Sequence, residues 1–186
     1  MSEKVTAKKK EPGMVTLVLV LTVISIVMAL CLGFINKATA PAIAENAQKA
    51  KEAAMQVVLP NEGTYDPVKY SGTDTTVAGV YQAGDLGYVV ETVPTSGFSG
   101  AIVMLTGFSA DGAVTGIAVV THAETSGLGS LAKTDVEWQS QFIGTTEPVK
   151  VTKDGGTIQA ITGSTITSRA ICDGVNSARA ALAELG

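Results

Sequence analysis

The sequence contains few of the residues that bind metal ions. Its 186 residues include one histidine, His122, and two cysteines, Cys31 and Cys172, which form no Cys-x-x-Cys pair. Zinc sites and iron–sulfur clusters need several cysteine or histidine ligands, so this composition excludes them and predicts no metal-binding residues. Redox chemistry on this chain would therefore need an organic cofactor.

Basic residues are also scarce in the larger part of the chain. Residues 1–59 contain seven lysines and four glutamates, a net charge of +3. Residues 60–186 contain six Lys and Arg against thirteen Asp and Glu, a net charge of −7. Proteins that bind nucleic acids need a basic face to displace phosphate counterions, so we expect no nucleic-acid partner.

One long uncharged, apolar run is present, from Met14 to Ile35. Its 22 residues extend about 33 Å as a helix, which matches the hydrocarbon core of a bilayer. The run is longer than the apolar region of a cleaved signal peptide, which favours an uncleaved, single transmembrane helix over residues 14–35. Four lysines precede it, so the positive-inside rule places residues 1–13 in the cytoplasm and residues 36–186 outside the cell membrane.

The residues after this run predict a helical stalk over 36–59. From Pro41 onward the segment is rich in Ala, Glu, Gln and Lys, which favour helices, and Pro60 ends it. Its apolar positions recur along one stripe. The stalk either continues the membrane helix outward or packs as an amphipathic helix on the domain that follows.

Residues 60–186 predict a single α+β domain with a mostly antiparallel sheet and helices packed on one face. Strands are indicated by four β-branched, apolar runs separated by turn residues: 76–83, 88–93, 101–108 and 114–120. The other expected elements are a loop over 61–75, a short helix over 134–142, short strands over 150–151 and 158–161, and a terminal helix over 168–185.

Two polar segments are candidate binding sites. The first follows the fourth expected strand, and its glycines allow close approach of a ligand, although an ordinary surface turn has the same composition. The second precedes the terminal helix, where free N–H groups and the helix dipole favour a bound phosphate, although a plain helix cap needs only one hydroxyl. The candidate residues are Glu124, Thr125, Gly127, Leu128 and Gly129 in the first segment and Thr162, Gly163, Ser164, Thr165, Ile166, Thr167 and Ser168 in the second.

The second segment closely resembles the Ser/Thr-Gly-Ala-Thr-x-Thr signature of FMN-binding domains that carry flavin in phosphoester linkage to a threonine. The order of the other features resembles the G subunits of Rnf complexes, which are membrane-bound ferredoxin:NAD+ oxidoreductases, and their relatives, the C subunits of Na+-translocating NADH:quinone reductases. These features are the basic N-terminus, the single span, the alanine-rich stalk, Gly97-Phe98-Ser99-Gly100, His122-x-Glu124-Thr125-x-Gly127-Leu128-Gly129 and Gln141-Phe142-x-Gly144.

The resemblance implies a protein that relays electrons outside the membrane through FMN, esterified to Thr165 or, as the fallback, to Thr167. It implies no catalytic residue on this chain alone. The implied partners are the other membrane subunits of an Rnf-type complex and a Mg2+-dependent flavin transferase that uses FAD. Three residues depart from the pattern: Ser164 replaces a usual alanine, Gln159 a frequent aspartate and Ser126 a frequent proline.

Two other functional classes fit parts of the sequence. The lysine-rich segment that ends in Gly13-Met14 resembles a prepilin leader, which indicates a type IV pilin-like structural protein. Pilins carry a glutamate at the fifth mature position, however, where this chain has Val18. An anchored sensor or ligand-binding module would have the same anchor without a covalent flavin.

Overall fold

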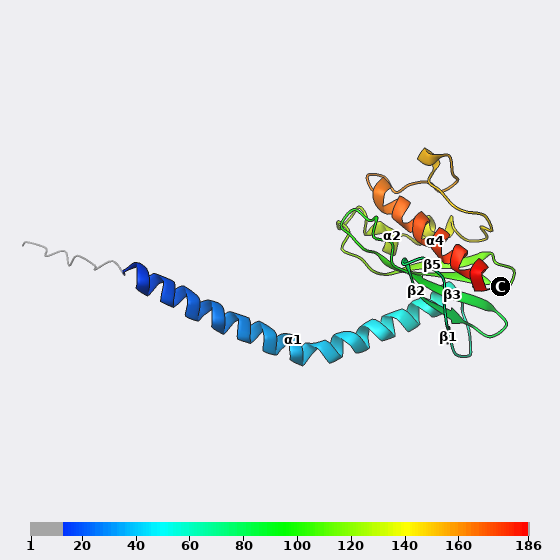
Figure 1. The fold of residues 1–186 in the computed structure, drawn as a ribbon. Coiled ribbons are helices and arrows are strands. Elements are labelled where there is room, and N and C mark those ends of the chain that lie inside the picture. Colours follow the sequence, from blue (N-terminus) through cyan, green and yellow to red (C-terminus); the bar gives the residue numbers. More distant parts are fainter. Residues whose placement is uncertain (1–12, 186) are drawn as a thin grey trace, which may run out of the picture. The chain divides into compact units, whose positions relative to one another are not determined.

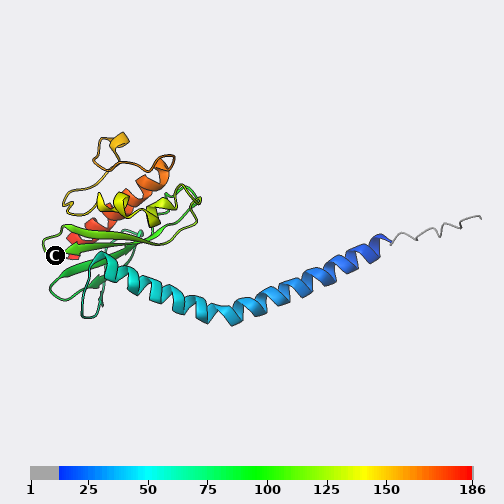
Figure 2. The same ribbon diagram turned by 180° about the vertical axis from the view of Figure 1, so that it is seen from behind.

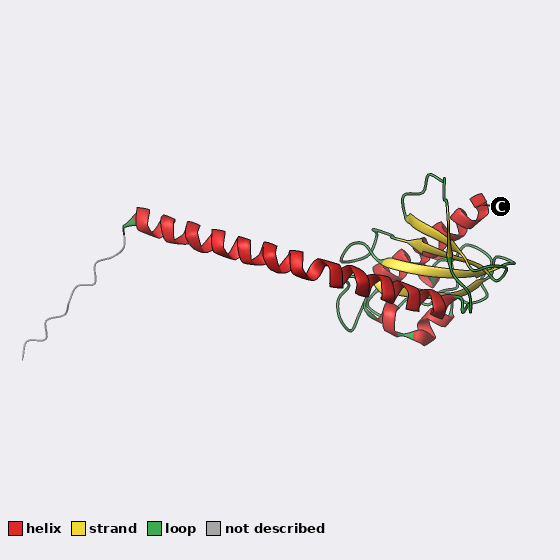
Figure 3. Ribbon diagram, turned by 90° about the horizontal axis from the view of Figure 1, so that it is seen from below, coloured by secondary structure: helices red, strands yellow, loops and turns green. Residues whose placement is uncertain are grey.

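The computed structural model describes residues 13–185 and divides into two units, one that ends at Ala47 and one that begins at Gln48. Figures 1 and 3 show its helices and strands. In chain order these are α1 (Met14–Val58), β1 (Asp66–Val68), β2 (Val77–Gln82), β3 (Gly87–Thr92), β4 (Val103–Ser109), β5 (Val114–Thr121), α2 (Leu131–Thr134), α3 (Val136–Ser140), the 3-10 helix η1 (Thr152–Asp154) and α4 (Thr165–Leu185).

Helix α1 joins the expected membrane span and stalk in one continuous helix of 45 residues that ends just before Pro60. Pro41 lies inside it, where its ring removes one backbone hydrogen bond without ending the helix. Among the described residues, α1 is the one helix long and apolar enough to cross a membrane. Its most apolar 18-residue window has a mean hydropathy of 2.9 and no buried side chain. The predicted cytoplasmic segment 1–13 lies, except for Gly13, outside the described residues.

The five strands form one antiparallel sheet in the order β1-β2-β3-β4-β5, so each strand pairs with its neighbour in sequence. This confirms the α+β fold class and all four predicted strands, whose ends differ by a few residues. Gly84 and Gly112 make the hairpin turns possible with backbone φ angles of 54° and 81°. The expected loop over 61–75 is wrong in part, because it contains the short edge strand β1, which has no apolar run and forms by pairing with β2.

Helices cover both faces of this sheet, not one as expected (Figures 1 and 2). One face packs under α4, α2 and α3 and forms the main core, with Val90, Met104 and Phe108 among its buried side chains. The other face carries the C-terminal end of α1, whose Met55 and Val58 pack against strand residues such as Val89 and Leu105. Successive side chains of a strand point to opposite faces, so strands buried on both faces read as continuous apolar runs.

The segment between β5 and α4 is less regular than the sequence suggests. Two short helices, α2 and α3, replace the single helix expected over 134–142, because Asp135 lies between them and its carboxylate accepts a hydrogen bond from the Trp138 N–H (2.9 Å). The two short strands expected at 150–151 and 158–161 reduce to a single parallel bridge between Val151 and Ile158. Helix α4 begins at Thr165, three residues earlier than predicted.

Candidate functional site

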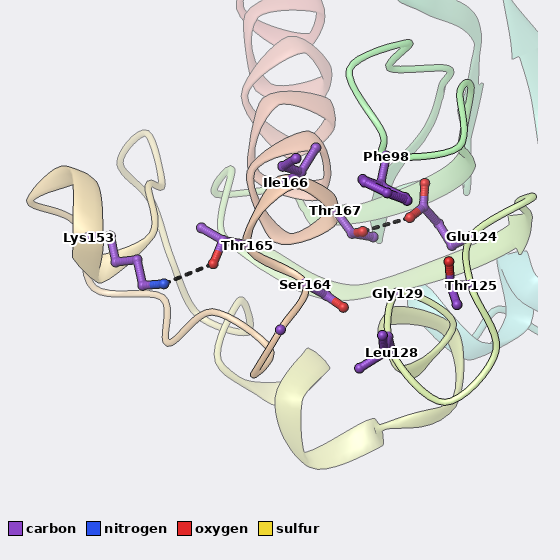
Figure 4. Close-up of a pocket in the computed structure, with 11 residues that line it drawn as sticks. Phe98, Glu124, Thr125, Leu128, Gly129, Lys153, Ser164, Thr165, Ile166 and Thr167 are labelled. Atoms are coloured by element: carbon purple, nitrogen blue, oxygen red, sulfur yellow. Dashed lines mark hydrogen bonds between the residues drawn. The ribbon is translucent and has the colours of Figure 1, made fainter.

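The two candidate segments meet at one cavity of about 300 Å³ (Figure 4). They approach from the loop after β5 and from the turn and first residues of α4, although some forty positions separate them in sequence. Nine of the twelve candidate residues line the cavity: Glu124, Thr125, Leu128, Gly129, Gly163, Ser164, Thr165, Ile166 and Thr167.

The other three candidates lie outside the cavity lining. Gly127 has a φ of 75° and shapes the turn, and Thr162 is exposed. Ser168 is buried, where its hydroxyl donates to the Ser164 carbonyl (3.0 Å) and accepts from the Ile161 N–H (3.0 Å). Ser168 therefore holds the turn before α4 in place. A helix cap needs only one hydroxyl, and this structural role explains one of the additional hydroxyls in the segment.

Glu124 connects three parts of the site from a buried position with 8% of its surface exposed. Its Oε1 accepts a hydrogen bond from the Ser99 N–H (3.0 Å), and its Oε2 accepts one from the Thr167 hydroxyl (2.7 Å). Both carboxylate oxygens thus have donors, as a buried charge requires. This arrangement joins the 97–100 loop, the loop after β5 and the start of α4.

Gly129 allows Glu124 to take this position. A Cβ atom at residue 129 would lie 2.6 Å from Glu124 Oε2 and 2.9 Å from Thr167 Oγ1, closer than real Cβ contacts. Gly129, which the sequence marks as a candidate binding residue, is therefore required for packing around the Glu124 carboxylate.

The two candidate acceptor threonines have different surroundings. Thr167 is 1% exposed and its hydroxyl donates to Glu124. The hydroxyl of Thr165 lines the cavity from a half-buried position and accepts a hydrogen bond from Lys153 Nζ (3.0 Å). Figure 4 shows these two hydrogen bonds in separate parts of the site. The Thr165 oxygen therefore lies at a place that a ligand can reach, beside a cation.

Three large apolar side chains at the cavity remain well exposed: Phe98 (67%), Leu128 (45%) and Ile166 (47%). Exposed apolar side chains beside a few polar groups are typical of a ligand site, because a bound apolar ring would remove them from water. In the sequence Phe98 is only one residue of a Gly-Phe-Ser-Gly motif, and its place at the cavity becomes evident in the structure.

Lys153 is, besides Phe98, the residue of the cavity lining that the sequence does not mark as a candidate. It belongs to η1, twelve positions before Thr165, in a segment without a recognisable motif.

Arg169, which the sequence places near the expected phosphate site, is paired with Asp154 instead. Its guanidinium makes two hydrogen bonds of 2.7 Å to Asp154, and these lower the pKa of that carboxyl below its usual value.

The remaining chemically distinctive residues lie outside the cavity lining. His122 Nδ1 accepts a hydrogen bond from the Glu124 backbone N–H (3.1 Å). Cys172 is buried on α4, and burial raises the pKa of its thiol to about 12, so it stays protonated as a small apolar side chain. Within residues 13–185, no group of three or more His, Cys, Asp or Glu side chains is placed to hold a metal ion.

Comparisons with known proteins agree on one family. A family model described as the FMN-binding domain matches residues 97–180, a range that contains every residue lining the cavity. The chain is 38% identical over 180 residues to the G subunit of the Na(+)-translocating ferredoxin:NAD(+) oxidoreductase complex of Acetobacterium woodii, a match that covers 85% of this chain and 86% of that protein.

Two further relatives are named as G subunits of ion-translocating oxidoreductase complexes. The protein of Methanosarcina acetivorans is 39% identical over 142 residues, covering 71% of this chain and 74% of its own length. The protein of Cereibacter sphaeroides is 35% identical over 170 residues, covering 82% of this chain and 77% of its own length.

Proposed function

The chain belongs to the family of G subunits of ion-translocating oxidoreductase complexes, and on that premise we propose that it relays electrons through an FMN esterified to Thr165. Membership in this family and the apolar helix α1 make it a membrane-anchored component of a multi-subunit complex. The observation that carries the proposed linkage is the position of the Thr165 hydroxyl, which lines the cavity beside Lys153.

The residues of the cavity fit such a cofactor. Apolar surface on Phe98, Leu128 and Ile166 suits a planar ring. The start of α4 offers backbone N–H groups to a phosphate, and Lys153 on η1 offers a cation. When bound, FMN supplies reversible electron transfer through its isoalloxazine ring. The protein's part is to bind and orient this ring and to limit its contact with water. Glu124 and Thr125 orient or hydrogen-bond it.

Thr165 suits esterification better than Thr167. A flavin transferase that uses FAD would join the Thr165 oxygen to the FMN phosphorus, with cleavage of the pyrophosphate bond and release of AMP and the hydroxyl proton. The Thr165 hydroxyl is half-buried at the cavity, whereas the Thr167 hydroxyl is buried and donates to a carboxylate. Esterification of Thr167 would remove that hydrogen bond from Glu124 and leave a buried oxygen without its donor.

We further propose the arrangement of the chain in the membrane. Residues 14–35 form a single transmembrane helix, residues 36–59 a helical stalk and residues 60–186 the extracytoplasmic FMN-binding domain. The four lysines before residue 11 support this orientation, because positive charge is retained on the cytoplasmic side. The flavin would then exchange electrons on the outer side of the membrane with other members of the complex.

Intact mass spectrometry tests the linkage on the full chain, co-produced with a flavin transferase. We expect the wild type to gain the mass of FMN less one water. Thr165→Val, which removes the hydroxyl at nearly constant volume, should carry no flavin. Thr157→Val is the matched control, since Thr157 is exposed, does not line the cavity and lies outside the threonine-rich segment, and it should be flavinylated like the wild type.

The same measurement separates the other functional classes. A pilin-like protein would lose its first thirteen residues and carry no flavin, and a sensor module would keep its full mass without an adduct. An adduct of equal intensity on Thr165→Val would show that Thr165 is not the attachment site.

A further inference from the structure

Lys153 occupies a distinctive position in the cavity. Among the described residues that line it, Lys153 is the only one with a positive charge, and its Nζ lies 3.0 Å from Thr165 Oγ1. In Figure 4 its side chain reaches from η1 across to the first residue of α4. The hydroxyl that we propose as the flavin acceptor thus already has an ammonium group at hydrogen-bond distance.

The chain holds Lys153 near Thr165 by a separate interaction. Asp154, the next residue, makes two hydrogen bonds of 2.7 Å to Arg169, which lies one helical turn after Thr165 on α4. The bridge between Val151 and Ile158 closes the loop that carries η1. Arg169 and Asp154 satisfy one another, whereas Lys153 is the cation of this region that lines the cavity.

The charges of the cavity lining are arranged asymmetrically. Lys153 lies at the Thr165 end, whereas the carboxylate of Glu124 lies by Thr167 and the Ser99 N–H. A phosphodiester carries one negative charge on its two non-bridging oxygens. Coulomb attraction therefore favours the phosphodiester beside Lys153 and away from Glu124.

We propose that Lys153 is a phosphate-binding residue that pairs with the phosphodiester on Thr165 and keeps the tethered flavin docked in the cavity. The inference rests on the proposed function. Esterification removes the hydroxyl proton of Thr165 and adds two acceptor oxygens within reach of the same ammonium group, so the existing hydrogen bond becomes an ion pair. Lys153 is a positioning residue in this role, because the flavin stays covalently attached without it.

Time-resolved fluorescence anisotropy of the flavin on the full-length, flavinylated chain tests this role. A docked flavin rotates with the protein, and an undocked one adds a fast component to the anisotropy decay. For Lys153→Met we expect the ratio of undocked to docked flavin to rise about two- to fivefold, the range typical of an exposed ion pair. Lys153→Arg should restore most of the docking, since it keeps the charge.

Lys150→Met is the matched control, because it removes the same charge from the same segment at a side chain outside the cavity lining. It should behave like the wild type. In the wild type, salt at about 1 M should raise the fast component, because salt screens an exposed ion pair, and it should leave Lys153→Met unchanged. The wild-type part of the salt experiment can be measured even if Lys153→Met is flavinylated poorly, and a wild type without a salt response would overturn the role of Lys153.

The outcomes distinguish this inference from the function on which it rests. If mass spectrometry finds no flavin on wild-type Thr165, the proposed function and the role of Lys153 are both wrong. If Thr165 carries flavin but neither Lys153→Met nor salt changes the fast component, the function stands and Lys153 does not hold the phosphodiester. An equal effect of Lys150→Met would indicate a general charge effect and would also overturn the role of Lys153.

Discussion

Glu124 illustrates how single residues organise the cavity. The sequence marks it as a polar residue in a glycine-containing loop and assigns it an orienting or hydrogen-bonding role. In the structure its two carboxylate oxygens accept hydrogen bonds from residues 25 positions before it and 43 positions after it in the chain. No local pattern encodes contacts of such separation, so the support that Glu124 gives to the site required the tertiary structure.

The hydrogen bond between Thr167 and Glu124 should stabilise the fold measurably. Thr167→Val leaves a buried carboxylate oxygen without its donor, so we expect the free energy of unfolding to fall by about 1–3 kcal/mol. Chemical denaturation of the full chain measures this loss. In the Glu124→Gln background the same substitution should cost less, because a neutral amide is less expensive to leave unpaired. Equal costs in both backgrounds would contradict coupling of the pair.

Gly129→Ala should destabilise the protein through steric overlap. The added methyl group would overlap Glu124 and the Thr167 hydroxyl, and overpacking of this kind typically costs about 1–3 kcal/mol. Ser126→Ala, at an exposed position of the same loop, is the control and should have little effect. Denaturant midpoints of the two variants compare them directly, and a midpoint for Gly129→Ala equal to that of the wild type would contradict the close approach of Gly129 to Glu124.

The pair formed by Asp154 and Arg169 predicts a pH dependence. Hydrogen bonds from Arg169 lower the pKa of Asp154 in the folded protein. A carboxyl with a lowered folded pKa stabilises the fold above its unfolded pKa of about 4, and this contribution is lost as pH falls through the folded value. The difference in unfolding free energy between wild type and Asp154→Asn should thus be constant near neutral pH and shrink below about pH 4. A difference that grows on acidification would contradict this assignment.

At the scale of elements, the end of α1 is part of the folded domain. Two glycines make room for it on the sheet: a Cβ at Gly107 would lie 2.5 Å from the Val58 carbonyl oxygen, and one at Gly116 would lie 3.2 Å from Val58 Cα. The Thr115 hydroxyl donates to the same carbonyl, which has no partner within the helix. Lys51 adds hydrogen bonds to Glu91 (2.5 Å) and to the Tyr81 hydroxyl (2.6 Å).

Substitutions on two sides of α1 should separate docking from helix formation. Met55 is buried against the sheet, so Met55→Ala should lower the free energy of unfolding by about 2–5 kcal/mol. Val57 is exposed two residues further on, and Val57→Ala should cost little and even favour the helix slightly. Thermal unfolding of both variants tests this prediction. Similar losses for the two would mean that the end of α1 does not pack as described.

Some helices and strands can be predicted from the sequence, and others depend on contacts that the sequence does not reveal. Strands β2 to β5 are long, β-branched and bounded by turns, and local propensity is enough to predict them. The three-residue β1 exists because β2 offers an unpaired edge, which no local signal reports. The single helix expected over 134–142 is replaced by two, because the Asp135 side chain caps the start of α3. This break depends on one hydrogen bond, from the Trp138 N–H to the Asp135 carboxylate.

At the scale of the whole molecule, charge around the apolar run predicts its orientation in the membrane. Cysteines introduced at Ser2 and Glu62 report on the two sides. We expect a membrane-impermeant maleimide to label Glu62→Cys in intact spheroplasts and Ser2→Cys only after permeabilisation. The native cysteines should give little background, since Cys31 lies in the proposed span and burial raises the pKa of Cys172 to about 12. The reverse labelling pattern would overturn the proposed orientation.

The sequence alone determined the apolar anchor, the four main strands and the threonine-rich segment that resembles a flavin attachment motif, because periodicity, charge and short motifs are local properties. Only the tertiary structure decided that helices cover both sheet faces, that the Thr167 hydroxyl donates to Glu124, and that the Thr165 hydroxyl accepts a hydrogen bond from Lys153. Those features depend on contacts between residues far apart in the chain, which form when α4 packs on the sheet and brings its first turn to the loop after β5.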